Sequence, residues 1–443
     1  MSGVSSENEP LLPSNGHSPN GHEEHLPFAR RVLLTVKAEG EPSWGASLKH
    51  ILLVSWFNIL LVFVPLSFIS HYLDWDAALR FGFSFMAIMP LAKASDSTEQ
   101  LSFTLGQTLS GLLNASFGNA VEIIVGIAAL FQDELRIVQT SMLGSILSNL
   151  LLVLGCSFLA GAYERDQNTF TVFAAQTSSS LMTLACITLV IPAAYHSSKE
   201  AEEDPYFNGK AFFSSPTLSE DSAPHFKEKS EAGLLAISRG TAIMLLIVYI
   251  AYLFFQLKTH KHLFVSKPHR QDSVEPREYR PRPANEPEDT QQMSVIAAGT
   301  VLLAVTVVTS FCADHLVASI EEVAIRYQIP KAFIGIILIP IVANAAEHVT
   351  SVWMAMKNKT ELSIGICVGS SIQIAIFVIP LLIIVGWITG HALTLFFADF
   401  ETIVLFVSVL LVNLLIQDGK SNYMEGLMLV TLYFVIALAF WVT

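Results

Sequence analysis

Two short stretches of this 443-residue chain place an acidic side chain inside a long apolar run. In GNAVEIIVG, Glu122 follows Asn119 by three residues, and ANAAEHVTS repeats the arrangement with Asn344 and Glu347. Residues three apart lie on one face of a helix, so each amide sits beside its carboxylate. Carboxylate and amide oxygens are ligands that hard divalent cations prefer, above all Ca²⁺ and, to a lesser degree, Mn²⁺. The two stretches therefore predict a cation site.

The two stretches are copies of one another. Glu347 follows Glu122 by 225 residues (347 − 122 = 225), and the same offset relates the two asparagines and carries Ser145 to Ser370. One ionisable group in the middle of a membrane span costs at least about 2.5 to 3.5 kcal/mol, so a pair at equivalent positions indicates a function. The candidate ligands are Glu122, Glu347, Asn119, Asn344, Ser145, Ser370 and Gln373.

The two glutamates can hold protons or a divalent cation, but not both together. A divalent cation needs both carboxylates ionised, whereas protons neutralise them. This competition is the minimal chemistry of an exchange of a metal cation for protons. His348, directly after Glu347, adds a third titratable side chain, so Glu122, Glu347 and His348 are the candidates for proton coupling.

Each of these residues also has a purely structural interpretation. A glutamate inside a membrane can be protonated and hydrogen-bonded within a helix bundle. Ser145 and Ser370 can bond backbone carbonyls or allow close packing, as serine often does in membrane helices. The ring of His348 can be hydrogen-bonded to a neighbouring helix. The duplication favours the functional interpretation for the glutamates. For the serines and the histidine, the functional and the structural interpretation both stay open.

The composition requires a membrane to position these side chains. The chain is 52% hydrophobic and 14% charged, whereas soluble domains have about a quarter charged residues. A spanning helix needs about 20 mostly apolar residues, and about eleven runs qualify. They lie near 50–70, 76–92, 101–131, 136–161, 169–195, 234–257, 293–313, 329–356, 361–388, 395–416 and 422–442. The predicted fold class is an all-α polytopic membrane protein of about eleven transmembrane helices.

The offset between the copies predicts inverted repeats. The third run matches the eighth and the fourth matches the ninth, and a displacement of five spans, being odd, reverses orientation. A pseudo-twofold axis in the membrane plane then relates two five-helix repeats, which follow one extra N-terminal helix, and it brings the two glutamates together near the midplane. The expected parts are a disordered cytosolic tail at 1–48, the first transmembrane helix at 49–72, repeat one at 73–257, a cytosolic linker at 258–292 and repeat two at 293–443.

The positive charges predict a cytosolic N-terminus. Sixteen of the 25 lysines and arginines then fall in cytosolic segments, as the positive-inside rule requires. The long loop at 196–233 is placed on the opposite side. An error of one helix in the count would reverse the predicted membrane orientation of the second half of the chain.

Three further features accompany the glutamates. The run from Ser97 to Phe131 is too long for one straight span, so we expect a tilt or a break around Gly106, Gly111 or Gly118. Three glutamates are expected at helix starts near the two mouths, where they could attract cations into each vestibule, but solvated helix starts normally favour glutamate and we prefer that explanation; these are Glu99, Glu321 and Glu322. The four cysteines all lie in apolar segments and are expected to be core residues.

Four motifs together carry a family resemblance: GNAVE at 118–122, ANAAEH at 343–348, TEQLS at 98–102 and VGSSIQIA at 368–375. With the inverted halves, they make the chain resemble a cation/proton exchanger of the CaCA superfamily, most similar to fungal and plant vacuolar Ca²⁺/H⁺ exchangers. The resemblance covers residues from about 50 to 443.

The resemblance implies a transporter of the vacuolar membrane that uses the proton gradient to move cytosolic Ca²⁺. It implies no chemical cofactor, only the transported ions Ca²⁺ and H⁺. Central ion binding falls to Glu122 and Glu347, and Glu99 matches a position near the cytosolic entrance. The residues that aid the two glutamates are Asn119, Asn344, His348, Ser370 and Gln373. The linker at 258–292 departs from the family, since it is rich in Arg and Pro rather than forming an acidic helix.

Other classes of function are weaker. Acidic residues also line cation channels, and a related exchanger could use another coupling ion. An intramembrane protease would need a metal-binding HExxH helix, paired aspartates or a serine dyad, and EHVTS supplies none. We expect no enzymatic activity and no nucleic-acid partner, and a homo-oligomer is compatible with the sequence. ENEPLL, from Glu7 to Leu12, has the dileucine pattern that adaptor proteins recognise.

Overall fold

The structure is a computed structural model, and its described residues are almost entirely helical. They are residue 49 and the ranges 56–94, 118–163, 165–170, 172–203, 223–259 and 295–442. Most of the predicted tail and linker, the dileucine pattern and Glu99 lie outside these residues, so the predictions for them stay predictions.

The first half of the chain contributes mostly single long helices. One of its short segments is a 3₁₀ helix (η1), and two are π-helices (η2 and η4). Its elements are η1 (Trp56–Val62), α3 (Phe63–Tyr72), α4 (Ala77–Ala94), α6 (Ala120–Phe131), α7 (Leu135–Leu147), η2 (Ser148–Val153), α8 (Leu154–Gly161), β1 (Asn168–Thr169), α9 (Val172–Glu203), α10 (Ala223–Phe254) and η4 (Phe255–Thr259).

The second half contributes two segmented spans between single helices. Its two π-helices are η6 and η7. Its elements are α11 (Val295–Tyr327), α12 (Lys331–Phe333), η6 (Ile334–Leu338), α13 (Ile339–Ala343), α14 (Ala345–Met356), α15 (Thr360–Gln373), η7 (Ile374–Val378), α16 (Ile379–Thr389), α17 (Asp399–Leu415), β2 (Lys420–Ser421) and α18 (Tyr423–Val442).

Six helices in the described ranges are long and apolar enough to cross a membrane, and a bent pair over Lys331–Met356 makes a seventh. Helix also occupies part of every one of the eleven apolar runs. Several of these helices are short, however, and α6 is described only from Ala120. The number eleven therefore stays a prediction.

Two predicted boundaries are wrong. The loop expected at 196–233 is partly helical, because α9 continues to Glu203 and α10 begins at Ala223. The residues after the apolar part of α9, SSKEAEE, include Lys, Ala and Glu, which favour helix without being apolar. Likewise α11 runs past the predicted end at 313 to Tyr327, where Gln328 takes a left-handed backbone angle (φ 53°) ahead of Pro330.

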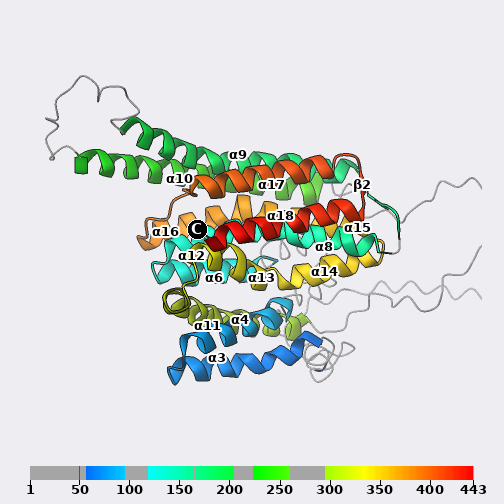
Figure 1. The fold of residues 1–443 in the computed structure, drawn as a ribbon, viewed down its shortest axis with the longest axis horizontal. Coiled ribbons are helices and arrows are strands. Elements are labelled where there is room, and N and C mark those ends of the chain that lie inside the picture. Colours follow the sequence, from blue (N-terminus) through cyan, green and yellow to red (C-terminus); the bar gives the residue numbers. More distant parts are fainter. Residues whose placement is uncertain are drawn as a thin grey trace, which may run out of the picture. The chain divides into compact units, whose positions relative to one another are not determined.

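The interior is built around the repeat-related spans that carry Ser145 and Ser370. The span Leu135–Gly161 is 83% buried and its counterpart Thr360–Thr389 is 56% buried, whereas the other four long spans are only 28 to 33% buried. Helices α9, α10, α17 and α18 lie around these two spans (Figure 1). Peripheral helices with little buried surface suit contact with lipid, and the enclosed pair suits a site kept away from it.

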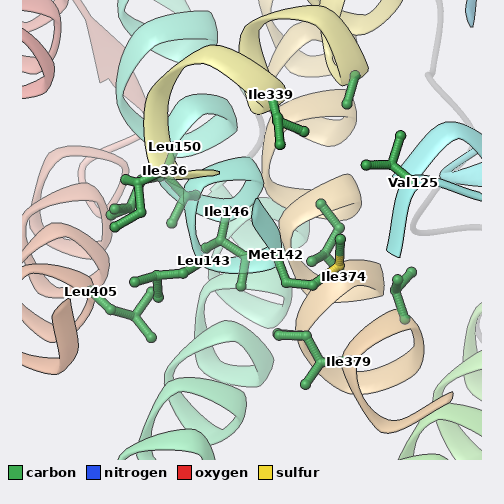
Figure 2. Packing of buried hydrophobic residues seen from close by; sticks show 14 of the residues in the cluster. Val125, Met142, Leu143, Ile146, Leu150, Ile336, Ile339, Ile374, Ile379 and Leu405 are labelled. Atoms are coloured by element: carbon green, nitrogen blue, oxygen red, sulfur yellow. The ribbon is translucent and has the colours of Figure 1, made fainter. Parts of the chain in front are cut away.

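Close packing of apolar side chains fills the centre. Met142 and Ile146 of α7 lie among Ile336, Ile374 and Ile379, which come from the other repeat (Figure 2). All five side chains are buried, with exposures of 5% or less. The core thus joins the two halves of the chain in one hydrophobic cluster.

The extra N-terminal helix is attached to the second half by a histidine pair. The rings of His71 in α3 and His315 in α11 stack with their centroids 4.0 Å apart. His315 is 3% exposed, and its Nδ1 lies 3.3 Å from the hydroxyl of Ser67, which in turn contacts Ser84 of α4. Helices α3, α4 and α11 therefore form one group (Figure 1).

Contacts between connecting segments fit the predicted alternation of sides. Strands β1 and β2, both assigned to the cytosolic side, pair in antiparallel register with Asn168 opposite Ser421. Segments assigned to the other side also meet, since Ser197 donates a 2.6 Å hydrogen bond to Asp399. The contacts do not say which end faces the cytosol, and that assignment stays a prediction.

The acids Glu321 and Glu322 are not at a helix start, contrary to our expectation. They lie in the last two turns of α11, where Glu322 pairs with Arg80 and Glu321 lies 3.5 Å from the ammonium of Lys331. Basic partners therefore account for these two side chains, because the C-terminal end of a helix does not favour negative charge.

Glycines allow α7 to approach the segmented span of the second repeat closely. A Cβ on Gly144 would collide with the carbonyl of Ile336, and a Cβ on Gly335 would collide with the side chain of Thr140. Gly240 of α10, by contrast, faces open space. The contact holds α7 against η6 and α13, next to Asn344.

We predict that Gly144→Ala destabilises the protein, whereas Gly240→Ala does not. Overpacking of a close contact costs about 1 to 3 kcal/mol, while alanine at an open helical position is favourable by up to about 1 kcal/mol. Thermal unfolding of the purified proteins in detergent measures the difference. Equal melting temperatures for the two variants would contradict the close contact.

Candidate functional site

Both asparagine–glutamate motifs lie where a helix begins inside the membrane region. Helix α6 begins at Ala120, directly after a turn at Gly118 and Asn119. In the second copy, the helical axis bends by 58° between α13 and α14, at Asn344. A turn at Gly118 and Asn119 therefore precedes α6, but the residues before Gly118, with Gly106 and Gly111 among them, lie outside the described residues, so the expected tilt or break stays a prediction.

The helix start gives each glutamate the same local environment. Both α6 and α14 have 12 residues, and in each the glutamate stands in the first turn with the asparagine at the N-cap. Unpaired backbone N–H groups at a helix start carry partial positive charge, which favours an anionic side chain. Glycine before Asn119 and a bend at Asn344 thus place a carboxylate where the backbone can support it.

The two carboxylates come close together, as the duplication predicts. Glu122 is only 2% exposed and Glu347 is partly buried, and the charges of the two side chains interact directly. Asn119 and Asn344 are each 1% exposed. Four of the predicted residues therefore lie in the interior rather than facing lipid.

Each asparagine contacts the serine position of the opposite repeat. The hydroxyl of Ser370 donates to Oδ1 of Asn119 at 2.8 Å, and Nδ2 of Asn344 donates to the backbone carbonyl of Ser145 at 3.1 Å. Nδ2 of Asn119 also donates to Oε1 of Gln373 at 2.6 Å. The two halves are thus crosslinked at equivalent positions, although Ser145 takes part through its backbone and Ser370 through its side chain.

Asn149 completes this network, and our sequence analysis missed it. Its Nδ2 donates to Oε2 of Glu347 at 3.0 Å and to the hydroxyl of Ser370 at 3.0 Å. The signal was present, because Asn149 is an amide in an apolar run, four residues after Ser145 and so on the same helix face. It was overlooked because the 225-residue offset leads to Ile374, which cannot serve as a ligand.

Three buried oxygens of this region lack a hydrogen-bond donor among the described residues. They are Oε1 of Glu122, Oδ1 of Asn149 and Oδ1 of Asn344. More than about 90% of buried polar groups in proteins are satisfied, so three unpaired acceptors in one region need an explanation. A cation is one partner that would satisfy all three, because each offers a free lone pair.

Acidic side chains alone do not make the site. The described residues contain no group of three or more histidine, cysteine, aspartate or glutamate side chains arranged to hold a metal ion. Any cation here would therefore combine the two carboxylates with amide and hydroxyl oxygens. Such mixed oxygen sets are typical of Ca²⁺, which takes six to eight oxygen ligands.

His348 is not part of the network in the described part of the chain. Its backbone N–H bonds Asn344, but its ring is only partly buried and makes no hydrogen bond there. Consecutive residues point about 100° apart on a helix, so His348 and Glu347 do not share one face of α14. The expectation that it acts with the glutamates has no direct contact to support it.

Wide helical turns follow the site in both repeats. The π-helix η2 begins at Ser148, and η7 begins at Ile374, one residue off the 225-residue offset. π-helical turns are rare and occur mostly at functional sites. Here each π-helix changes the direction in which the following side chains point, after the residues that contact the asparagines. The two repeats therefore share a backbone feature as well as sequence motifs.

Comparison with known proteins agrees with this arrangement. A family model described as sodium/calcium exchanger protein matches residues 76–258 and 297–442. A vacuolar calcium ion transporter of Schizosaccharomyces pombe is 45% identical over 393 residues, which cover 88% of this chain and 86% of that protein. A Ca²⁺/H⁺ antiporter of Aphanothece halophytica is 38% identical over 384 residues, which cover 86% and 95%.

A solved structure has the same fold. The structure of native YfkE superposes with a TM-score of 0.67 at 31% sequence identity, covering 87% of this chain and 100% of that one. The predicted all-α polytopic membrane fold and the family resemblance are confirmed. With the family model matched over most of the chain and a relative 45% identical over 88% of it, the chain belongs to the sodium/calcium exchanger protein family.

Proposed function

We propose that this protein exchanges Ca²⁺ for H⁺ across the vacuolar membrane by alternating access, with Glu122 and Glu347 as the shared binding site. The observation that carries the proposal is that the charges of these two carboxylates interact in the interior, where three buried oxygens, one of them Oε1 of Glu122, have no hydrogen-bond donor among the described residues. The names of the relatives from S. pombe and A. halophytica support the substrate, and the first also supports the vacuolar membrane.

The mechanism follows from the cost of uncompensated charge. With Ca²⁺ bound, the two negative charges are balanced, and with both carboxylates protonated there is no charge to balance. The empty, ionised pair carries two negative charges that neither a proton nor a cation balances, in a medium that solvates them poorly. We infer that only the two compensated forms change between inward and outward access, which couples the movement of Ca²⁺ to that of protons.

The ligand set favours Ca²⁺ over softer metals and admits Mn²⁺ as a weaker substrate. The carboxylates of Glu122 and Glu347 supply the charge, and neutral oxygens supply the remaining coordination. The neutral candidates are Asn119, Asn344, Asn149, Ser145, Ser370 and Gln373. No step uses a chemical cofactor or turns over a substrate covalently, so we propose a transporter and not an enzyme.

The remaining parts of the proposal rest on sequence. We propose that the N-terminus is cytosolic, that Glu99 stands at the cytosolic entrance and that the motif from Glu7 to Leu12 binds adaptor proteins. We also keep the division of the chain that we predicted from the sequence: a tail, a first transmembrane helix, two inverted repeats and the linker between them.

We predict that Glu122→Gln and Glu347→Gln each abolish proton-coupled Ca²⁺ uptake without unfolding the protein, because glutamine keeps the shape but cannot gain or lose the proton. Uptake of ⁴⁵Ca²⁺ into sealed vesicles with an acidic interior, with and without a protonophore, measures this. Glu361→Gln, outside the site, is the matched control and retains uptake. Robust uptake by either site variant would contradict the mechanism.

The same assay separates the alternatives. Flux that follows the Ca²⁺ gradient regardless of pH would indicate a channel, and flux driven by a Na⁺ gradient would indicate a different coupling ion.

We predict that Asn149→Ala raises the Ca²⁺ concentration for half-maximal uptake by about tenfold or more, since a hydrogen bond to a charged group is worth about 1.5 to 3 kcal/mol. Asn413→Ala is the matched control. Asn413 is an amide that bridges α9 and α17 through Ser179 and Thr183, away from the site. An unchanged half-saturating concentration for Asn149→Ala would remove this residue from the site.

We predict that His348→Asn changes the rate or the ratio of Ca²⁺ to Mn²⁺ uptake but does not eliminate transport, because the ring makes no hydrogen bond to the network. Parallel uptake of the two ions by the variant and the wild type measures the ratio. Complete loss of transport would assign His348 an essential part in proton coupling.

A further inference from the structure

Helix α18 packs closely along the span that carries Ser145 and Asn149. It lies beside α8 (Figure 1), and it also contacts η2. A Cβ on Gly155 of α8 would collide with the carbonyl of Gly426 in α18, and a Cβ on Gly426 would collide with the carbonyl of Gly155. The two backbones therefore touch, and α18 cannot shift against this span without opening a tight contact.

The same pairing of helices places a tyrosine behind the π-helix η2. Tyr433 follows Gly426 by seven residues, and Ser148 precedes Gly155 by seven, which is about two helical turns in each case. Because the positions change in opposite directions, the two helices run antiparallel and Tyr433 meets Ser148. The hydroxyl of Tyr433 lies beside that of Ser148, close enough for the two groups to interact.

Both hydroxyl groups are buried, and neither is satisfied by its own helix. Tyr433 and Ser148 are each 1% exposed, and neither oxygen has a partner within normal hydrogen-bond geometry among the described residues. Ser141 and Ser157, which lie before and after Ser148 on the same span, each donate to a carbonyl of their own helix. Ser148 therefore does not bond locally, and each of the two hydroxyls is the partner that the other lacks.

Packing alone does not account for the hydroxyl of Tyr433. A phenylalanine would fill the same space, and it would avoid the cost of burying an unsatisfied hydroxyl. Tyrosine is also common where helices leave the membrane, because its ring is apolar and its tip is polar. Tyr433, however, stands in the middle of α18 and is buried. Its hydroxyl therefore needs a role other than packing or anchoring.

Asn149, the residue next to Ser148, depends on the orientation of η2. Its Nδ2 has two hydrogens and two acceptors, Oε2 of Glu347 and the hydroxyl of Ser370, each at 3.0 Å. Its Oδ1 has no partner among the described residues and is one of the three unpaired oxygens of the site. A rotation of η2 would lengthen both hydrogen bonds, and a flip of the amide would turn Oδ1 against the carboxylate.

We propose that Tyr433 is a positioning residue for the cation site. Its hydroxyl bonds that of Ser148 and so holds η2 in the orientation that directs the amide of Asn149 toward Glu347. The π-helix thereby gains side-chain support from α18 directly before the residue that contacts the glutamate. The proposal rests on the proposed function, because it assumes that the two glutamates bind Ca²⁺ as the transported ion.

The test measures the Ca²⁺ affinity of the full-length protein, by equilibrium binding of ⁴⁵Ca²⁺ to purified protein and by uptake into liposomes driven by a pH gradient. We expect Tyr433→Phe to raise the half-saturating Ca²⁺ concentration about threefold to tenfold, the loss typical of one neutral hydrogen bond, and to keep the maximal uptake rate. Ser148→Ala should have the same effect, because it removes the other hydroxyl. A variant that only lost folded protein would instead lower the maximal rate at unchanged affinity.

The decisive comparison is made in the Asn149→Ala protein. If Tyr433 acts through Asn149, adding Tyr433→Phe to this variant changes its Ca²⁺ affinity no further, because the amide that Tyr433 positions is gone. Tyr252→Phe is the matched control, since Tyr252 is a partly buried tyrosine of α10, a helix that carries none of the candidate site residues. Its Ca²⁺ affinity should equal that of the wild type.

Two results would overturn the positioning role while leaving the proposed exchange intact. One is an unchanged Ca²⁺ affinity of Tyr433→Phe, and the other is an equal loss of affinity with and without the side chain of Asn149. If the wild-type protein binds Ca²⁺ but shows no uptake driven by a pH gradient, the proposed exchange fails, and the same comparison by equilibrium binding still decides the positioning role.

Discussion

The carboxylates of Glu122, which is almost fully buried, and Glu347, which is partly buried, lie near enough to repel each other when both are ionised, and the rest of the structure depends on how that repulsion is met. Glu122 and Glu347 gain support from the helix starts behind them, since each stands in the first turn of its helix. Glu347 gains further support from the amide of Asn149. These donors stabilise ionised oxygens only in part, which is why we propose that the site takes up a cation or protons.

The apolar core around the two carboxylates is the second physical condition on which the site depends. A pair of acidic side chains would be ordinary on a solvated surface, but here the neighbouring spans Leu135–Gly161 and Thr360–Thr389 are the two most buried of the six long spans in the described residues. The glycine contact between α7 and η6 brings the segmented helix close enough for Asn344 to reach the backbone of Ser145. The packing in Figure 2 therefore fixes the distance between the halves as well as excluding water. We expect looser packing to weaken the competition between protons and a cation for the two carboxylates before it unfolds the chain.

The sequence was informative where it places energetically costly residues in membrane spans and does so twice. Glu122, Glu347 and their asparagines could be found because ionisable groups rarely enter a membrane without a reason, and the 225-residue offset tied them together. Asn149 escaped because its role arises from three-dimensional contact with Glu347 and Ser370, and it has no polar copy. Helix boundaries were harder, as in α9 and α11, because helical propensity continues beyond the apolar stretch that a membrane requires.

The departures from symmetry have their own consequence. Offset by 225 residues, Gln373 corresponds to Ser148 and Asn149 corresponds to Ile374, so the two repeats do not offer the same neutral oxygens. Asn149 bonds the carboxylate of the second repeat, while the corresponding Ile374 can form no such bond with Glu122. Among the residues that the structure describes, Oε1 of Glu122 has no hydrogen-bond partner. The two glutamates therefore differ in how far the protein itself stabilises their charge, and a proton or a cation that enters the site meets two unequal carboxylates.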